Sequence, residues 1–389
     1  MADEVRVHGS CDPWFFAVRD VFAEQVQAEP GHGAAVCVIV EGRTVVDLFA
    51  GTASRRTRRA WGPDTLVNVY SATKGISAFC IHLLVERGQL ELTAPVARYW
   101  PEFAAHGKDA VTVAQLLSHQ AGLAALAETL PAEARYDHAR MVRALVDTPP
   151  ERSADFGHAY HAQTFGFLVG ELVRRVSGRS LGTFLRQELA GPREIDFWIG
   201  LDEAEDGRVA LVTRPLGVQP PPGHPDLSRV FQSEPESLSA RAFGNPRPEP
   251  GAVNTRAFRA AELPGSNGHG HARALAQVYA AAVSAWGKPL LSAQELQACY
   301  TPLVDGHDGV LRLRTSFSAG FLCKTDGPGS GFGRGSGAHA FGHPGMGGAL
   351  GCADPAAAMG FGYVTNRASA SILIDTRPEA LLDACYACL

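Results

Sequence analysis

The stretch NVYSATKGISAFCIHLLVERG, from Asn68 to Gly88, decides how the rest of the sequence is interpreted. Apolar residues follow Ser71 at the spacing of one helix face, and Gly88 stands where a helix would end. Ser71 precedes Lys74 by three positions, so the two side chains share a face, with about 5–6 Å between their β-carbons. The stretch therefore predicts a helix that opens with a serine and a lysine within reach of each other.

This serine–lysine pair has two interpretations. A serine hydroxyl is a poor nucleophile at neutral pH and needs an adjacent base. A lysine serves as that base when burial lowers its pKa, and apolar residues flank the SATK tetrapeptide on both sides. Alternatively, Ser71 caps the helix and Lys74 is exposed to solvent. The tetrapeptide alone does not choose between them.

The composition restricts the function classes. A content of 46% hydrophobic and 19% charged residues is typical of a soluble globular protein. The length of 389 residues exceeds that of one usual domain and predicts two lobes. The net charge of −5 offers no field that attracts a polyanion, so we expect no nucleic-acid partner. We see no signal peptide and no run of about twenty apolar residues, so we expect no membrane partner. Eight thinly spread cysteines favour a cytoplasmic protein with reduced thiols.

Several residues resemble metal or base sites but favour a structural interpretation. Cys385 and Cys388 supply two of the four ligands of a zinc site, which favours incidental thiols. His269 and His271 lie at a helix entrance, where packing and capping are the expected roles. His119 is interpreted as a structural histidine. We therefore expect no metal and no cofactor.

Hydrophobic patterns give an order of elements along the chain. A helix is predicted at 12–28, and the runs at 34–40 and 44–50 flank an EGR turn, which indicates a β-hairpin. Further helices are predicted at 112–122, at 165–178, after the capping Ser180, from His271 and at the C-terminus, with short strands between the last two. A proline-rich insert at about 214–252 shows no sustained periodicity and is predicted to be irregular, as lids or walls of binding sites often are.

Strands therefore occur at both ends of the chain, with helices between them. This order predicts an α/β domain with an inserted all-α domain. Residues 1–72 and 265–389 would form the discontinuous α/β domain. Residues 73–264 would form the mainly helical domain, which includes the proline-rich insert.

Two further segments narrow the interpretation of the SATK pair. FGHAYHAQTFGFLVGELVRR places Tyr160 just before a helix, and FGHPGMGGALG places His343 near the end of an expected edge strand. This layout resembles the serine β-lactamase and penicillin-binding-protein superfamily, most closely the family VIII carboxylesterases, which look like class C β-lactamases. Segments such as LLSHQAGL extend the resemblance over nearly the whole chain. It implies a β-lactamase/transpeptidase-like fold, with an antiparallel sheet flanked by helices.

The resemblance also implies roles for individual residues. Ser71 would be the acylated nucleophile and Lys74 its proton acceptor. Tyr160 would move a proton between them and the leaving group, its own pKa lowered by the nearby ammonium.

The segment around His343 would bind the substrate. His343 stands where the lactamases carry the lysine of their K-T-G motif, and would orient the substrate or the tyrosine. Gly345 lets a substrate approach the backbone. The backbone N–H of Met346 would form an oxyanion hole with that of Ser71.

The chain departs from the family pattern in three places. Ala162 replaces an asparagine that holds the amide side chain of a β-lactam, and His343 replaces a lysine that pairs with its carboxylate. RSAD, from Arg152 to Asp155, replaces a W-x-P-G stretch and leaves the substrate class open. These changes favour an uncharged ester.

The function expected is therefore a serine hydrolase that cleaves small carboxylic esters, or amides, through an acyl-enzyme. The alternative is an acyltransferase that passes the acyl group to an amine or alcohol acceptor. A β-lactamase and a non-enzymatic relative rank below both. The partner is a small-molecule ester or amide.

Overall fold

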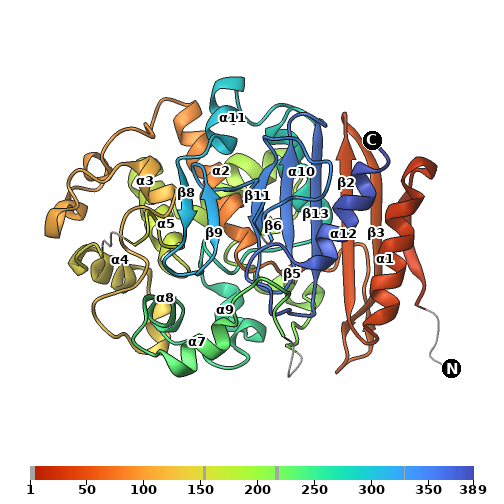
Figure 1. Ribbon diagram of the computed structural model, residues 1–389, viewed down its shortest axis with the longest axis horizontal. Coiled ribbons are helices and arrows are strands. Elements are labelled where there is room, and N and C mark those ends of the chain that lie inside the picture. The colour runs from red at the N-terminus through yellow and green to blue at the C-terminus, as the bar shows by residue number, and fades with distance from the viewer. Residues whose placement is uncertain (1–4, 152–154, 215–218, 328) are drawn as a thin grey trace.

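The computed structural model describes residues 5–151, 155–214, 219–327 and 329–389, with an antiparallel sheet at its centre (Figure 1). Within these ranges the sheet has ten strands, in the order β1-β3-β2-β13-β12-β11-β10-β9-β8, with β4 paired to β3. The strands are β1 (Val7–Cys11), β2 (Gly33–Val40), β3 (Arg43–Ser54), β4 (Arg59–Ala60), β8 (Val304–His307), β9 (Arg314–Phe317), β10 (Leu322–Cys323), β11 (Phe341–Pro344), β12 (Leu350–Asp354) and β13 (Met359–Thr365). Strands from the N-terminal and C-terminal parts of the sequence thus share one antiparallel sheet, as expected.

The predicted hairpin is present as β2 and β3. Val40 pairs with Arg43, so Glu41 and Gly42 alone form the turn. Both have positive φ, +47° and +82°, as the tightest hairpin turns require. On its other side β2 pairs along its length with β13, the last strand of the chain. This pairing joins the two ends of the sequence in one sheet.

Helices cover both faces of the sheet. Residues Ala35, Cys37 and Ile39 of β2 belong to the core beneath α10 (Ala272–Ala282). The alternate residues Val36 and Val38 belong to the core beneath α1 (Phe16–Ala28) and α12 (Thr376–Tyr386). Because successive side chains of a strand point to opposite faces, these helices lie on opposite sides. Figure 1 shows α1 and α12 together at the end of the molecule that holds both chain termini.

Glycines bring α10 into contact with the strands. A β-carbon at Gly360 would lie 2.4 Å from the nitrogen of Ala280, and one at Gly362 would lie 2.1 Å from the oxygen of Ala272. No side chain fits at these two positions of β13. The helix backbone therefore rests directly on the strand.

The helix that opens at Ser71 is α2 (Ala72–Glu86), and it lies deep in the molecule. Every residue from Ala72 to Leu84 is buried. The prediction of this helix is confirmed, but the expectation of one apolar face is wrong. Helix α2 packs at once against β11 and against α5 (Thr164–Ser177), α6 (Leu181–Phe184) and α11 (Ala293–Tyr300).

Ten further α-helices lie within the described ranges. They are α1 (Phe16–Ala28), α3 (Val113–Leu117), α4 (His138–Asp147), α5 (Thr164–Ser177), α6 (Leu181–Phe184), α7 (Leu227–Ser233), α8 (Leu238–Gly244), α9 (Arg256–Ala260), α11 (Ala293–Tyr300) and α12 (Thr376–Tyr386). The predicted cap of α6 is confirmed, because the Ser180 side chain accepts a hydrogen bond from the Thr183 N–H. Gly178, which has φ +73°, caps the C-terminal end of α5.

Two predictions are wrong in extent. The helix predicted to close at Gly122 ends at Leu117, because the backbone of His119 has φ +63° and turns away. The insert predicted to be irregular holds α7 and α8. Their starts are capped by Asp226 and Ser237, signals that the prolines around them obscured.

A second, small sheet positions the start of α2. It has the order β5-β7-β6, from β5 (Val67–Asn68), β7 (His269–Gly270) and β6 (Phe197–Trp198). The Val69 N–H extends the contact by donating to the Gly268 oxygen at 2.9 Å. The segment that leads into Ser71 is therefore held by pairing with a distant part of the chain.

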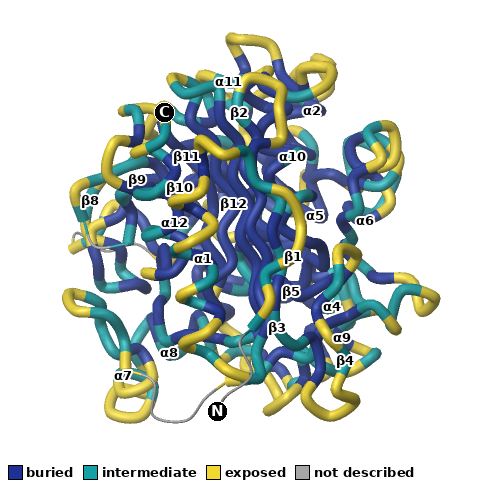
Figure 2. Tube along the Cα trace, turned by 90° about the vertical axis from the view of Figure 1, so that its right-hand side faces the viewer, coloured by how far each residue is buried: buried dark blue, intermediate teal, exposed yellow. Residues whose placement is uncertain are grey.

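Buried residues follow the sheet and the helices that pack on it, and exposed residues gather in the peripheral loops (Figure 2). Over the described ranges, no helix combines the length and the apolar character needed to span a membrane.

A buried ion pair links α2 to α11. Nδ1 of His82 lies 2.5 Å from Oε1 of Glu295, and Nε2 lies 2.8 Å from the oxygen of Ala319. Both partners are acceptors, so both ring nitrogens must carry protons. Burial acts to lower the pKa of His82, but Cys299 and Glu295 together raise it to about 10. The pair therefore holds a charged imidazolium between α2 and α11.

We predict that Glu295→Gln lowers the melting temperature at pH 6.5, because removing one partner of a buried pair costs about 3–5 kcal/mol. A raised folded-state pKa contributes stability that is complete below the ordinary histidine value and is lost as the pH rises through about 10. The difference from wild type should therefore shrink at pH 9.5. Melting curves of both proteins at the two pH values test this, and an equal difference at both would contradict it.

Candidate active site

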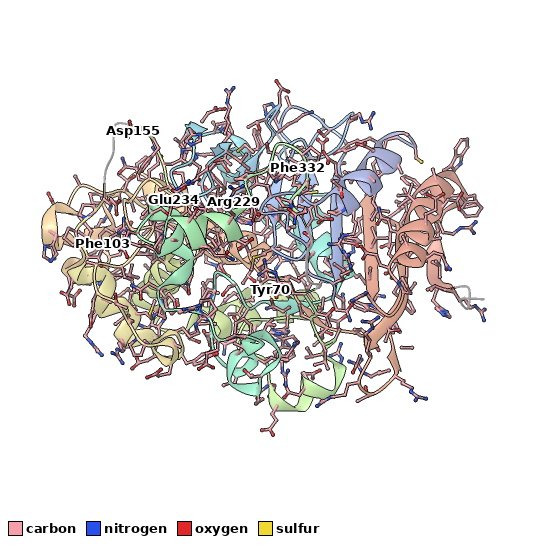
Figure 3. The ribbon with its side chains drawn as sticks, turned by 60° about the horizontal axis from the view of Figure 1, so that its bottom comes forward. Tyr70, Phe103, Asp155, Arg229, Glu234 and Phe332 are labelled. Carbon is pink, nitrogen blue, oxygen red and sulfur yellow. The ribbon has the colours of Figure 1, made fainter. Side chains whose placement is uncertain are left out.

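Ser71 lies at a sharp turn between β5 and α2. Tyr70, labelled near the centre of Figure 3, has φ +48°, a conformation that is strained for a residue with a side chain. The Tyr70 N–H donates to Oδ1 of Asn68 at 3.2 Å, and the Tyr70 oxygen accepts from Oγ1 of Thr73 at 2.5 Å. The Ser71 side chain makes no capping hydrogen bond. The capping interpretation of this serine is therefore wrong, and its hydroxyl is available to Lys74.

Lys74 is fully buried and bonds to three oxygens. Its Nζ lies 3.2 Å from Oγ of Ser71, 3.0 Å from the oxygen of Ala162 and 2.8 Å from the oxygen of Gly265. An ammonium group has three protons, and these three acceptors satisfy all of them. The interpretation of Lys74 as a solvent-exposed residue is also wrong.

The same three contacts also orient Lys74 when its amine is neutral. A neutral amine has two N–H groups, and carbonyl oxygens can only accept, so the bonds to Ala162 and Gly265 occupy both. The lone pair is then directed at Oγ of Ser71, in position to receive its proton. Burial lowers the pKa of Lys74 to about 7, so an appreciable fraction is neutral at neutral pH. Lys74 can act as a general base here.

Tyr160 lies next to this pair, in the segment that precedes α5. Its ring is centred 4.9 Å from Nζ of Lys74, and the Ser71 side chain is close enough to influence the pKa of the phenol. The expectation of a lowered tyrosine pKa is wrong. Burial raises the pKa of Tyr160 and Asp308 adds to the effect, while the neighbouring Ser71 side chain opposes both. The phenol is therefore protonated and can donate its proton.

His343 lies on β11, which has β12 on one side and β10 on the other, so the expected edge strand is wrong. Its Nδ1 lies 2.8 Å from the oxygen of Pro344, which fixes the proton on that nitrogen. Nε2 is buried without a partner among the described residues. Burial, with Lys74 nearby, lowers the pKa of His343 to about 3. The ring is neutral and its Nε2 is a hydrogen-bond acceptor.

The turn after β11 lies against the start of α2. A β-carbon at Gly345 would lie 2.1 Å from the oxygen of Val69 and 3.3 Å from the nitrogen of Ala72. In the described part of the chain, neither the Ser71 N–H nor the Met346 N–H donates to a protein acceptor. Both donors are thus available for an oxyanion at this junction.

Other contributors to the site were not predicted. Gly265 and Ala162 contribute backbone oxygens. Every residue has such an oxygen, so the residue type does not predict this role. Asp308 holds Tyr160 in place by accepting its backbone N–H at 3.1 Å. His119 packs its ring on that of Tyr160, 4.7 Å between centroids, and its Nδ1 accepts the His161 N–H at 3.1 Å.

Two further expectations from the sequence concern the RSAD stretch and the candidate metal ligands. Of the RSAD stretch, residues 152–154 lie outside the described residues. Over the rest of the chain that the structure describes, no group of three histidine, cysteine or acidic side chains is arranged to hold a metal ion.

Comparison with known proteins places the chain in a family. A family model described as Beta-lactamase matches residues 18–384. The chain belongs to the β-lactamase family. The resemblance inferred from SATK, Tyr160 and His343 is confirmed at the level of the family and its fold.

Individual relatives cover nearly all of the chain. The esterase/beta-lactamase LipL of Mycobacterium tuberculosis is 34% identical over 378 residues, which are 93% of this chain and 83% of LipL. A penicillin-binding-protein homologue from Caulobacter crescentus has a TM-score of 0.88 at 35% identity, covering 99% of this chain and 100% of the other. A family VIII carboxylesterase has a TM-score of 0.86 at 36% identity, with the same coverage. This β-lactamase-family chain is a serine hydrolase of the β-lactamase-like superfamily.

The state of Lys74 predicts the pH dependence. Raising the pH through about 7 removes its proton and creates the base, so kcat/KM for p-nitrophenyl acetate should rise across that value and level off above it. His343, with its pKa near 3, is already neutral in this window. The variant His343→Asn should therefore keep the acidic limb. A limb that disappears in this variant while activity remains would remove Lys74 from the role of base.

Proposed function

We propose that this chain is an esterase that cleaves small, uncharged carboxylic esters through an acyl-enzyme on Ser71. The observation that carries the proposal is the set of three hydrogen bonds of Lys74, of which one is directed at Oγ of Ser71. The relatives named esterase and carboxylesterase support an ester as the bond that is cleaved.

Acylation would use the groups around Ser71 in order. The Ser71 hydroxyl gives its proton to Lys74 as Oγ bonds to the carbonyl carbon of the ester. The carbonyl oxygen becomes an oxyanion, for which the N–H groups of Ser71 and Met346 are the available donors, each worth about 3–4 kcal/mol. The bond to the leaving oxygen then breaks, and that oxygen takes a proton from Tyr160. Lys74 returns its proton to Tyr160.

Deacylation would repeat these transfers with water in place of the serine hydroxyl. The water gives its proton to Tyr160 as Tyr160 passes its own proton to Lys74, while the water oxygen attacks the acyl carbon. Lys74 then returns the proton to Oγ of Ser71 as the ester bond breaks. An amine or alcohol that replaced water would make the same site an acyltransferase. The proposal is hydrolysis, and transfer is an outcome that the experiment below detects.

The preference for uncharged esters rests on the electrostatics of the substrate side. His343 is neutral and presents an acceptor, so it offers no cation to a substrate carboxylate. Ala162 has no side-chain amide and uses its backbone oxygen to hold Lys74. A neutral substrate needs neither a cation at His343 nor a side-chain amide at Ala162.

We expect Ser71→Ala to abolish hydrolysis of p-nitrophenyl butyrate, and Lys74→Met and Tyr160→Phe each to lower kcat by at least about 100-fold, as for positioned acid–base groups. Each variant has a matched control. Ser77 lies on the same helix and bonds the Pro264 oxygen. Lys108 is a buried lysine on two carbonyl oxygens, those of Val146 and Thr148, at 2.8 and 2.7 Å. The buried Tyr279, whose hydroxyl has no partner among the described residues, completes the set.

The variants Ser77→Ala, Lys108→Met and Tyr279→Phe should keep at least about a third of the wild-type kcat. Intact-mass analysis after mixing with the ester should show one acyl adduct, absent in Ser71→Ala. The adduct should decay in water, and added amines should not speed its loss. Decay only with an amine would establish acyl transfer, and no adduct in active wild-type enzyme would refute the acyl-enzyme.

We also predict that wild-type enzyme turns over ampicillin far more slowly than p-nitrophenyl butyrate, because its carboxylate finds no cation at His343. The variant His343→Lys should lower KM for ampicillin by about tenfold, the effect of roughly 1.4 kcal/mol from a new charge pair. Steady-state kinetics with both substrates measure this. Wild-type turnover of ampicillin equal to that of the ester would show that another group binds the carboxylate.

A further inference from the structure

The turn between β11 and β12 carries Met346, one of the two oxyanion donors in the proposed mechanism. Two backbone hydrogen bonds close this turn: Gly345 N–H to the Ala349 oxygen at 2.7 Å, and Gly348 N–H to the Gly345 oxygen at 2.9 Å. Gly347 and Gly348 have φ of +124° and +99°. Glycine has the greatest freedom of backbone rotation, so these two residues do not hold the direction of the Met346 N–H by themselves.

Side chains on two sides restrict the turn instead. A β-carbon at Gly347 would lie 3.2 Å from the ring of Tyr70, the residue before the nucleophile. A β-carbon at Gly348 would lie 2.5 Å from Nη2 of Arg377. The turn is therefore packed between the residue that precedes Ser71 and an arginine of the C-terminal helix α12.

Arg377 is only 9% exposed, and every nitrogen of its guanidinium is bonded. Nε donates to Oδ1 of Asp375 at 2.7 Å, and Nη1 donates to Oε2 of Glu29 at 3.2 Å and to the Arg367 oxygen at 3.2 Å. Nη2 donates to the oxygen of Gly347 at 3.1 Å and to Oδ2 of Asp375 at 3.3 Å. Two carboxylates fix the planar guanidinium, so its bond to the turn has a fixed direction.

We propose that Arg377 is a positioning residue, which fixes the Gly347 carbonyl and through it the direction of the Met346 N–H. The inference rests on the proposed function, because it assigns Met346 to the oxyanion hole. The Gly347 carbonyl and the Gly348 N–H belong to one planar peptide group, and the Gly345 carbonyl and the Met346 N–H belong to another. The hydrogen bond from the Gly348 N–H to the Gly345 oxygen joins the two groups, so holding the first restricts the rotation of the second. Arg377 touches no reacting atom and would act on the transition state through the backbone alone.

The network offers a matched control. Arg367 bonds the other oxygen of the same Glu29 carboxylate, Nη1 to Oε1 at 2.8 Å, and within the described ranges its side chain forms no hydrogen bond with the turn. Arg367→Met removes an arginine from the carboxylate and leaves the bond to Gly347 in place. Arg377→Met removes that bond. A comparison of the two variants separates loss of the ion-pair network from loss of the contact with the turn.

The test measures oxyanion stabilisation directly. An alkyl trifluoromethyl ketone forms a hemiketal when Oγ of the nucleophile bonds to its carbonyl carbon, the serine proton passes to the base, and the carbonyl oxygen becomes an anion. Its inhibition constant does not depend on the fraction of active protein, so partial unfolding does not imitate the effect. The inhibition constant, kcat and KM for p-nitrophenyl butyrate are measured for wild type, Arg377→Met, Arg377→Lys and Arg367→Met, with a melting temperature for each.

Complete loss of one oxyanion donor lowers kcat by about 10²–10³, so a misdirected donor should cost at least about tenfold. We expect Arg377→Met to lower kcat and raise the inhibition constant by that factor, with KM changed by less than about threefold. Arg377→Lys should fall between Arg377→Met and wild type, and Arg367→Met should match wild type. Unchanged kcat and inhibition constant in folded Arg377→Met, or an equal change in Arg367→Met, would overturn the inference. If Arg377→Met does not fold, the same values for Arg377→Lys decide. Wild type that the ketone does not inhibit and the ester does not acylate would instead refute the proposed function.

Discussion

A lysine amine with no access to water is the constraint on which the rest of this structure depends. Lys74 has no exposed surface, and its three partners are Ser71 on its own helix and the oxygens of Ala162 and Gly265. Those oxygens come from segments about 90 and 190 residues further along the chain. Because a buried amine without partners is strongly unfavourable, the fold must bring both segments to the same point. The contacts that give the Lys74 amine its hydrogen-bond partners are therefore the same contacts that assemble the site.

Close backbone contacts show how the fold meets this requirement. A β-carbon at Gly166 of α5 would lie 2.3 Å from the nitrogen of Gly265, so only glycine lets that segment approach α5. On the other side of α2, a β-carbon at Gly75 would lie 2.1 Å from the hydroxyl oxygen of Tyr279 and 3.3 Å from the β-carbon of His343. Glycines beside the lysine therefore set the distances at which α5 and β11 meet α2.

The sequence predicted those features whose signal is local. The hairpin depends on a two-residue turn, and the start of α2 depends on the apolar spacing after Ser71, so both follow from neighbouring letters. The burial of Lys74, which a lysine base would require, is confirmed, but its acceptors could not be predicted, since a carbonyl oxygen has no residue signature. The early end of α3 at His119 and the central place of β11 arise from tertiary contacts. The oxyanion role of Met346 remains a prediction.

The surroundings of Lys74 also limit where the serine proton can go. His343 has its Nδ1 proton held by the Pro344 oxygen, and His161 donates from Nδ1 to the Ala159 oxygen while its Nε2 accepts the Leu123 N–H. Burial lowers the pKa of both rings, to about 3 for His343 and about 4 for His161.

A proton on either ring would therefore be unstable near pH 7, and a protonated His161 would also lose the bond from the Leu123 N–H. Tyr160 is already a protonated phenol, since burial raises its pKa. Lys74 is the group beside Ser71 whose pKa lies near 7 and whose protonated form has an oxygen for each N–H. In the proposed mechanism, the neutral histidines would leave the positive charge on the lysine, next to the developing oxyanion, until Lys74 returns its proton to Tyr160.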